Sequence, residues 1–285
     1  MPRLLALGAL ALALAACDAA ETDAALATAA LDDAATAIAS AVALDAGGLL
    51  EEAASAASLA APPEAGARHP DPRPGCQAER TYDEATGVWT AVADCERGDP
   101  DGRFYATFER TTTYRFLDAD GQPLPGREGA ASVEVDVLSG SSLFRSPRGV
   151  HALDALTSDL TVTDLGQDLV TVAGTVQRAA SDTLRGRRGV RTLDYELDAT
   201  LDGVQGPPGV TRRWRRAVAG TVSGTLVATL TRTPRGGETE TVEIDQAFTI
   251  TFPTDGRGDR VAEIVLGGRR YRADVETGEI AGLSD

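Results

Sequence analysis

The sequence predicts a mainly β protein: a curved antiparallel meander of ten to twelve strands, half-barrel or barrel-like, after a short Ala-rich segment that is helical or disordered. Three observations lead to this fold class. Apolar and polar residues alternate along most of the chain from residue 76 onward. Turn-forming residues such as Gly, Pro and Asp separate the alternating runs. The stretch before residue 62 is instead rich in alanine and does not alternate.

The clearest alternation lies in residues 193–201. One face of this run collects only apolar side chains, namely Leu193, Tyr195, Leu197, Ala199 and Leu201. The opposite face carries Asp194, Glu196, Asp198 and Thr200. A period of two gives one buried and one solvated face, which is typical of antiparallel sheet. A longer run, Val218 to Leu230, has glycines on its apolar face, which predicts a strongly bent sheet.

The Ala-rich stretch, residues 18–61, carries eight acidic residues and no basic one. Leu31, Ile38, Val42 and Leu49 recur at spacings that suit one stripe of a helix. The pair Gly47-Gly48 would interrupt that helix and divide it in two. Because alanine buries little surface, a partly disordered tether remains an alternative.

The chain divides at a proline cluster. We expect a signal peptide over residues 1–16, a lipidated and Ala-rich segment over 17–61, a Pro-rich linker over 62–75, and the antiparallel β domain over 76–285.

The first residues have the pattern of an export signal. Arg3 precedes an uncharged, mostly apolar run that is too short to span a membrane. The run ends in Leu14-Ala15-Ala16-Cys17, which resembles the lipobox of bacterial lipoproteins. The resemblance implies cleavage before Cys17, lipidation of Cys17, and a protein anchored to the cell envelope. Asp18 is compatible with retention in the inner membrane and with surface export. The sequence therefore does not decide which membrane holds the protein or on which side of it the protein lies.

Composition excludes several classes of function. The chain has no lysine, which excludes a P-loop lysine and a lysine Schiff base. His69 and His151 are the only histidines, too few for a three-histidine zinc site. The net charge of -16 disfavours nucleic acid as a partner. We expect no metal and no other cofactor.

Cys76 and Cys95 are expected to form a disulfide, because an exported protein meets an oxidising compartment. The residues between them read as a β-hairpin with Gly87 in the left-handed turn position. The two cysteines would then face each other across the open end of the hairpin.

The most unusual segment is Arg212-Arg213-Trp214-Arg215-Arg216. Arg212, Trp214 and Arg216 share a face and could bind an anion or a glycan, with the indole as a stacking platform. The interpretation that we favour is structural. It pairs residues 191–202 with residues 210–218 as antiparallel neighbours, so that the arginines lie beside the acids of the first strand.

These patterns lead to one functional hypothesis. The protein is a membrane-anchored envelope lipoprotein with a non-enzymatic binding or structural β ectodomain, and a hydrophobic ligand would fit its curved sheet. The alternative is a hydrolase that uses His151, although no GxSxG motif supports it. A histidine within reach of a serine and a carboxylate would favour the enzyme.

Overall fold

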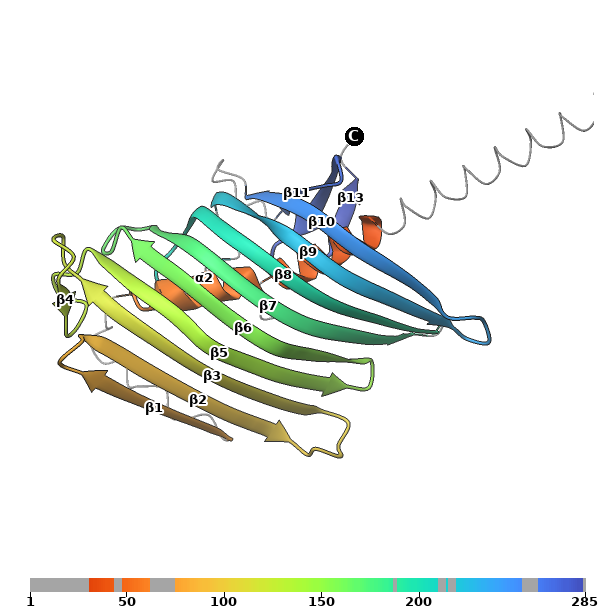
Figure 1. Ribbon diagram of the computed structural model, residues 1–285, viewed down its shortest axis with the longest axis horizontal. Helices are drawn as coiled ribbons and strands as arrows, with labels where there is room; N and C mark the ends of the chain where they lie inside the picture. The colour runs from red at the N-terminus through yellow and green to blue at the C-terminus, as the bar shows by residue number, and fades with distance from the viewer. Residues whose placement is uncertain are drawn as a thin grey trace, which may run out of the picture.

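One antiparallel sheet dominates the structure, a computed structural model that describes residues 31–43, 48–61, 75–186, 189–209, 214, 219–252 and 261–283. In these residues, twelve strands follow one another across the sheet in the order of the chain, and the short β4 pairs only with β3 (Figure 1). The described strands β1 and β13 lie at opposite edges and do not pair with each other, so the sheet stays open. The predicted fold class, a curved antiparallel meander, is confirmed.

The strands lengthen toward the middle of the sheet. Their bounds are β1 Cys76–Asp83, β2 Val88–Gly98, β3 Tyr105–Leu117, β4 Pro123–Leu124, β5 Ser132–Ser146, β6 Gly149–Thr163, β7 Val170–Gly186, β8 Gly189–Gly206, β9 Ala219–Pro234, β10 Glu240–Phe252, β11 Val261–Leu266, β12 Arg269–Asp274 and β13 Ile280–Leu283. Residues 31–42 form one helix, and α2 spans Leu49–Ser58.

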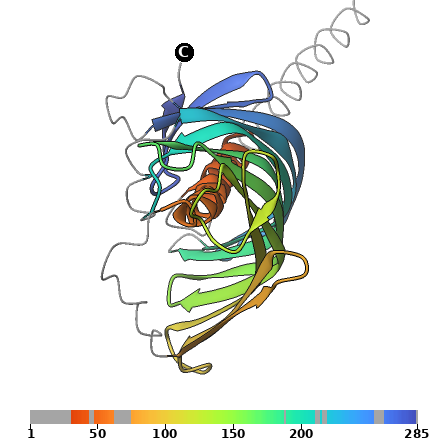
Figure 2. The same ribbon diagram turned by 90° about the vertical axis from the view of Figure 1, so that its left-hand side faces the viewer.

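The sheet curls around the two helices, which lie in its hollow (Figure 2). Glycines at two positions allow adjacent strands to come close as the sheet bends. A Cβ at Gly174 would collide with the carbonyl oxygen of Asp159, and one at Gly224 would collide with that of Asp198. Gly174 also has a φ of 137°, which other residues rarely adopt. The curvature that the glycines predicted is therefore built into the central strands.

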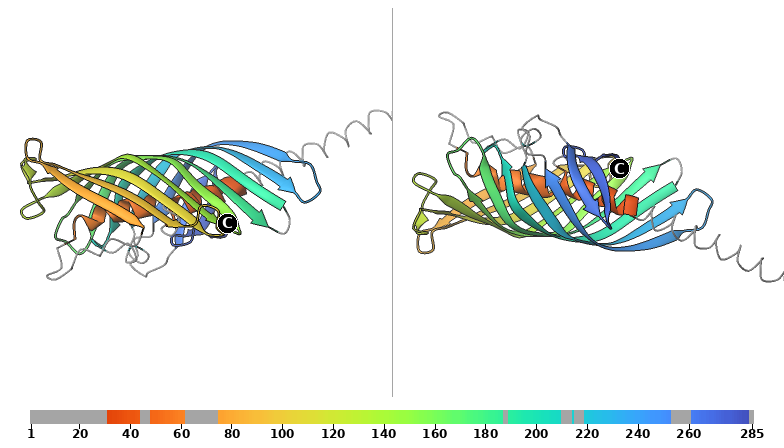
Figure 3. Two further views of the ribbon diagram at one scale, coloured as in Figure 1. Left: turned by 90° about the horizontal axis from the view of Figure 1, so that it is seen from below. Right: turned by 90° about the horizontal axis from the view of Figure 1, so that it is seen from above.

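The helices and the concave face of the sheet share one hydrophobic core. Figure 3 shows the helical segment running along the hollow, across the strands. The alternating apolar faces point inward, so that Leu197 and Leu226 are each about 1% exposed or less. The alanines of both helices are buried as well, since their small side chains let the helix backbone approach the sheet. Of the two alternatives for the Ala-rich segment, the helical one is confirmed over residues 31–42 and 49–58.

The break between the two helices falls where the glycine pair predicted it. Gly48 precedes α2 in an extended conformation, and a Cβ there would collide with the backbone of Val42 and Ala43. Gly47 lies outside the described residues. The close approach at Gly48 leaves no room for a side chain and fixes how sharply the second helix follows the first.

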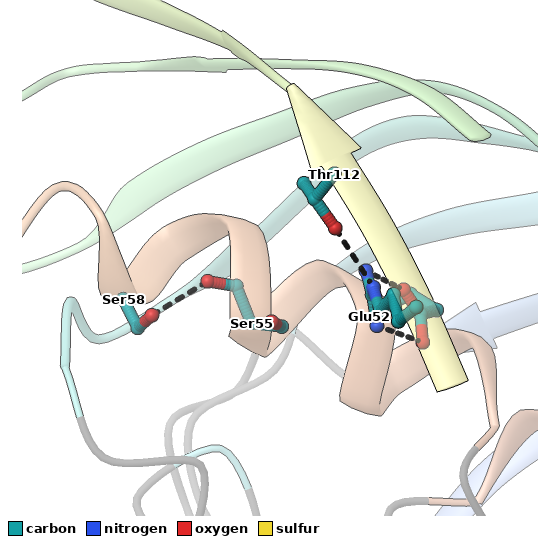
Figure 4. Close-up of polar contacts among 5 residues, drawn as sticks. Glu52, Ser55, Ser58 and Thr112 are labelled. Carbon is teal, nitrogen blue, oxygen red and sulfur yellow. Dashed lines mark hydrogen bonds and ion pairs between the residues drawn. The ribbon is translucent and has the colours of Figure 1, made fainter. Parts of the chain in front are cut away.

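A buried ion pair ties α2 to the sheet. Arg110 of β3 donates two hydrogen bonds to the carboxylate of Glu52, at 2.9 and 2.6 Å, and a third from Nε to the hydroxyl of Thr112 at 3.1 Å. Figure 4 shows Glu52 reaching from the helix toward Thr112 on the strand. The Glu52 and Arg110 side chains are 6% and 14% exposed. Because both charges are largely removed from water, each depends on the other for compensation.

The helix of residues 31–42 is tied to the other half of the sheet. Asp33 forms ion pairs with Arg191 of β8 and Arg232 of β9. The hydroxyl of Tyr271, in β12, donates to Asp32 at 3.0 Å. These contacts join residues far apart in the sequence, so the Ala-rich segment belongs to the core of the β domain.

The first hairpin agrees with its prediction. Cys76 lies directly opposite Cys95 in the register of β1 and β2, with their Cα atoms 3.9 Å apart and their sulfurs at disulfide-bonding distance. Gly87 has the expected left-handed conformation, with a φ of 69°. The predicted disulfide is confirmed across the open end of this hairpin.

Glu52→Ala should lower the free energy of unfolding by about 3–5 kcal/mol, because it leaves the charge of Arg110 buried without a partner. Adding Arg110→Met should recover most of this loss, since both charges are then absent. Urea unfolding followed by circular dichroism measures both effects.

The exposed pair of Arg115 and Glu134 provides the control, because its side chains are 41% and 37% exposed. Glu134→Ala should cost less than about 1 kcal/mol. Equal losses in Glu52→Ala and Glu134→Ala would contradict a special contribution from the buried pair.

Candidate functional site

A pocket of about 520 Å³ lies at one end of the concave face, between the helix of residues 31–42 and the inner side of β5 to β8. The turns that join β5 to β6 and β7 to β8 lie at the same end of the sheet. One part of the lining is apolar and consists of Ala37, Phe144, Leu153, Leu184, Leu193 and Tyr195. The other part is polar and consists of Thr36, Ser40, Ser142, His151, Asp182 and Arg191.

The register of the ladders places the polar residues on one face. His151 of β6 lies opposite Phe144 of β5 on one side and opposite Asp182 of β7 on the other. Directly opposed residues have their Cβ atoms about 5 Å apart, so their side chains meet. Leu184, two residues after Asp182, lies opposite Arg191 of β8. The strands thus bring an imidazole, a carboxylate and a guanidinium together from three segments of the chain.

His151 and Asp182 form the closest polar contact of the pocket. The Nδ1 atom of His151 lies 2.5 Å from Oδ1 of Asp182, and both side chains are about a quarter exposed. Because a carboxylate only accepts hydrogen bonds, Nδ1 carries the hydrogen and Nε2 is the ring nitrogen left for another partner. No hydrogen bond joins His151 to a serine within the described part of the chain.

A row of alternating charges continues from this contact across the sheet. Arg191 lies within the field of Asp182, and its Nη2 atom is 3.1 Å from Oδ1 of Asp33. Arg232 pairs with the other oxygen of the same carboxylate. Burial lowers the pKa of Arg191, while the charge of Asp182 acts in the opposite direction. One carboxylate therefore holds two arginines at this end of the helix.

The apolar wall divides into a buried floor and an open mouth. Leu153, Leu193 and Tyr195 are buried, whereas Phe144 and Leu184 are 50% and 57% exposed. Burial raises the pKa of Tyr195 to about 12, so its phenol stays neutral at physiological pH. Single exposed apolar side chains are common on protein surfaces, but exposed apolar side chains that adjoin a pocket indicate a binding site. Here they extend the apolar floor outward.

The predicted anion site at Arg212, Trp214 and Arg216 is not supported at its central residue. Trp214 is fully buried, and its indole N–H donates to the carbonyl oxygen of Pro207 at 2.8 Å. A Cβ at Gly206 would collide with the indole, so the ring packs directly on the end of β8. A buried indole offers no stacking platform to a ligand. Arg212 and Arg216 lie outside the described residues.

The predicted pairing of residues 191–202 with 210–218 is wrong. The strand partner on that side is β9, with Asp194 opposite Thr229 and Asp198 opposite Thr225. On the other side, the same strand pairs with β7. The chain between β8 and β9 forms a connection in which Trp214 packs against Gly206. Because this connection is long, the strand that returns beside β8 begins only after residues 210–218, which the charge pattern had favoured as the partner.

Sequence reasoning named His151 but missed Asp182 and Arg191. The turn between Ser146 and Gly149 could have aligned β5 with β6, because these two residues pair at its ends. The alignment of β6 with β7 depends on an irregularity between Leu153 and Ala155 that no local pattern predicts. Without that register, the partner of His151 could not be chosen among the many acids of the chain.

Comparison with known proteins gives no match to a protein-family model, to a curated protein or to a solved structure. The described residues contain no group of three or more His, Cys, Asp or Glu side chains that could hold a metal ion. No helix in the described ranges is long and apolar enough to cross a membrane. The residues that resemble a lipobox, Leu14 to Cys17, lie outside those ranges.

Proposed function

We propose that this protein is a lipid-anchored binding protein of the bacterial envelope, whose curved sheet holds a hydrophobic ligand in the pocket beside the helix of residues 31–42. The pocket itself carries the proposal. Its volume of about 520 Å³ lies within the range of small-molecule sites, roughly 300–1,000 Å³. An apolar wall with a few convergent polar groups is also what such sites have in common.

The anchor rests on the first residues of the chain. Leu14-Ala15-Ala16-Cys17 supplies the apolar, small and cysteine positions of a lipobox, directly after an apolar signal core. A lipid anchor would keep the pocket close to a membrane surface, where molecules with hydrocarbon chains are concentrated. Binding and anchoring then serve one task, which is to hold an apolar molecule at the envelope.

A second candidate function is hydrolysis with His151 as a general base. The contact between His151 and Asp182 favours it, since a carboxylate on Nδ1 orients an imidazole for proton transfer at Nε2. Nucleophilic catalysis also needs a hydroxyl within reach of the base. In the described residues the histidine forms no hydrogen bond to a serine, and for this reason we place binding first.

The full-length Cys17→Ser protein should bind the neutral apolar dye N-phenyl-1-naphthylamine saturably, with one dye per chain. Phe144→Ala should weaken this binding about fivefold, because the apolar contact that it removes is worth about 1 kcal/mol. Val227→Ala is the matched control: Val227 is also 50% exposed but is opposite Glu196 on the other face of the sheet, and it should leave binding unchanged. Dye fluorescence measures all three proteins.

Binding that never saturates, or equal losses in both variants, would contradict the pocket as the binding site. The same proteins, given 4-nitrophenyl decanoate, should release no nitrophenol above the buffer rate. Sustained release that disappears in Asp182→Asn would instead support the hydrolase.

Cys17→Ser should abolish membrane association, because the diacylglycerol of the proposed anchor would be attached through the sulfur of Cys17. Fractionation of cells into membrane and soluble material measures this, together with the mass of the N-terminal peptide. Cys76→Ser is the control, since it removes a cysteine outside the lipobox and should stay with the membrane. A Cys17→Ser protein that fractionates with the membrane as the unaltered protein does would rule out the anchor.

A further inference from the structure

His151 presents to the pocket one ring nitrogen that the fold itself does not use. Its Nδ1–H donates to Asp182, so in the neutral imidazole Nε2 holds a lone pair and can only accept a hydrogen bond. Among the described residues nothing donates to Nε2, and it is not one of the buried side-chain atoms that lack a partner. The His151 side chain lines the pocket and is 25% exposed, so this acceptor is open to a ligand.

The strand register places this nitrogen on the side of the pocket that β5 forms. The two ring nitrogens of an imidazole point to roughly opposite sides, and Nδ1 is directed at Asp182 on β7. Nε2 therefore points away from β7, toward the β5 side. Phe144 of β5 lies directly opposite His151. Ser142, two residues earlier on the same face of β5, is a diagonal neighbour of the histidine, within reach of a group that contacts both.

Ser142 supplies the complementary group. Its hydroxyl lines the pocket and has no hydrogen-bond partner among the described residues. It can donate to the oxygen of a ligand hydroxyl whose own hydrogen is donated to Nε2 of His151. A carboxylate or an ether has no hydrogen to donate to Nε2, and an ammonium group has no lone pair to accept from Ser142. A hydroxyl is the head group that satisfies both side chains.

The charged side chains around the pocket cancel one another. Asp182 and Arg191 are the two in the lining. Asp33 and Arg232 continue the row of charges, so two acids balance two bases. An ionic head group would lose its hydration here without meeting a surplus of opposite charge. For an anion, the net charge of -16 on the whole chain adds to this cost. The polar end of the pocket therefore suits a neutral head group.

We propose that the pocket binds a neutral single-chain lipid with a free hydroxyl head group, which donates to Nε2 of His151 and accepts from Ser142. This inference rests on the proposed function and specifies its ligand. Leu153, two residues after His151 on the same strand, belongs to the buried apolar floor. Phe144, directly opposite His151, belongs to the exposed mouth. The head site therefore adjoins the apolar wall, along which the hydrocarbon chain would lie.

The test compares three molecules with a ten-carbon chain that differ in head group: 1-decanol, 1-methoxydecane and decanoate. Each displaces N-phenyl-1-naphthylamine from the full-length Cys17→Ser protein, at concentrations where it stays dissolved as single molecules. An apolar pocket alone would favour the ether, because the ether is less polar than the alcohol. 1-Decanol should nevertheless act at about fivefold lower concentration, since only the alcohol can donate to Nε2. Decanoate should be weaker than 1-decanol.

Two variants test the assigned contacts. His151→Phe removes the acceptor and keeps a ring, so 1-decanol should lose its advantage over the ether while the dye still binds. Ser142→Ala should reduce that advantage about twofold to threefold, because one of the two hydrogen bonds is lost. Ser141→Ala is the matched control, since Ser141 is the neighbouring residue on the opposite face of β5 and does not line the pocket. It should change nothing.

Asp182 acts as a positioning residue, because it holds the hydrogen on Nδ1 of His151. The amide introduced by Asp182→Asn can donate to Nδ1, so it should allow the hydrogen to move to Nε2 and reduce the advantage of 1-decanol. Nitrogen NMR of the histidine side chains reads the tautomer directly. In the Cys17→Ser protein, Nε2 should carry no hydrogen, and its signal should shift when 1-decanol binds. The chain has two histidines, so His151→Phe assigns the signal.

The outcomes separate the two proposals. Equal displacement by 1-decanol and the ether, or an advantage of 1-decanol that His151→Phe leaves unchanged, would overturn the hydroxyl head group while the hydrophobic pocket stands. Preferred binding of decanoate would also overturn it, in favour of an anionic ligand. If neither the dye nor any of the three molecules binds, the proposed function fails together with the inference.

Discussion

An open sheet with an apolar concave face needs another element to keep that face from water, and here an alanine-rich pair of helices does so. A closed barrel would fill its interior with side chains from its own strands. In this protein the sheet curls only part of the way, and the helices of residues 31–42 and 49–58 occupy the hollow. Alanine is the right residue for this place, because larger side chains would force the helix away from the strands.

The choice of alanine has an energetic consequence. Alanine contributes little apolar area, so the helices gain less from burial than leucine-rich helices would. Ion pairs supplement the packing. Glu52 binds Arg110 near one edge of the sheet, and Asp33 binds Arg191 and Arg232 nearer the other. Such pairs add directional contacts that fix how the helical segment lies in the hollow, which apolar packing of small residues does not specify by itself.

The pocket follows from the same arrangement. Where the helix of residues 31–42 covers the strands, small side chains fill the space. At the end of β5 to β8 the wall bears long side chains such as Phe144 and Leu184, and the helix presents the smaller side chains of Thr36, Ala37 and Ser40. The mismatch leaves a hollow instead of a packed core. The ion pair between Asp33 and Arg191 lies beside this hollow, so a contact that holds the helix also positions a side chain of the pocket lining.

Much of the fold could be predicted because strand faces are a local property. The alternation around Leu197 identified the buried face, and the glycines in the run Val218 to Leu230, Gly224 among them, indicated the bend. The disulfide followed from a hairpin whose turn lies midway between Cys76 and Cys95. Contacts between distant segments could not be found in this way. Nothing near Glu52 indicates Arg110, because the two meet only after the helix enters the curled sheet.

The errors have the same origin. Residues 191–202 were matched to the nearest basic segment, but the strand partner begins only after a connection that contains the buried Trp214. The partner of His151 was missed for the same reason. Its pairing with Asp182 depends on the register of β6 and β7, which shifts at an irregularity between them. Where a turn is short, sequence predicts the partner, and where the connection is long or a ladder is interrupted, tertiary packing decides.

Native-state hydrogen exchange tests the central claim most directly, namely that the helices are part of the core and not a covering that detaches. If they are, the amides within residues 31–42 and 49–58 should exchange with the same free energy as those at the centres of β7 and β8, by global unfolding. Exchange of the helical amides through local opening, while β7 and β8 stay protected, would contradict the account. The helices would then be a separate, weakly attached layer, and the pocket would not be a fixed feature of the fold.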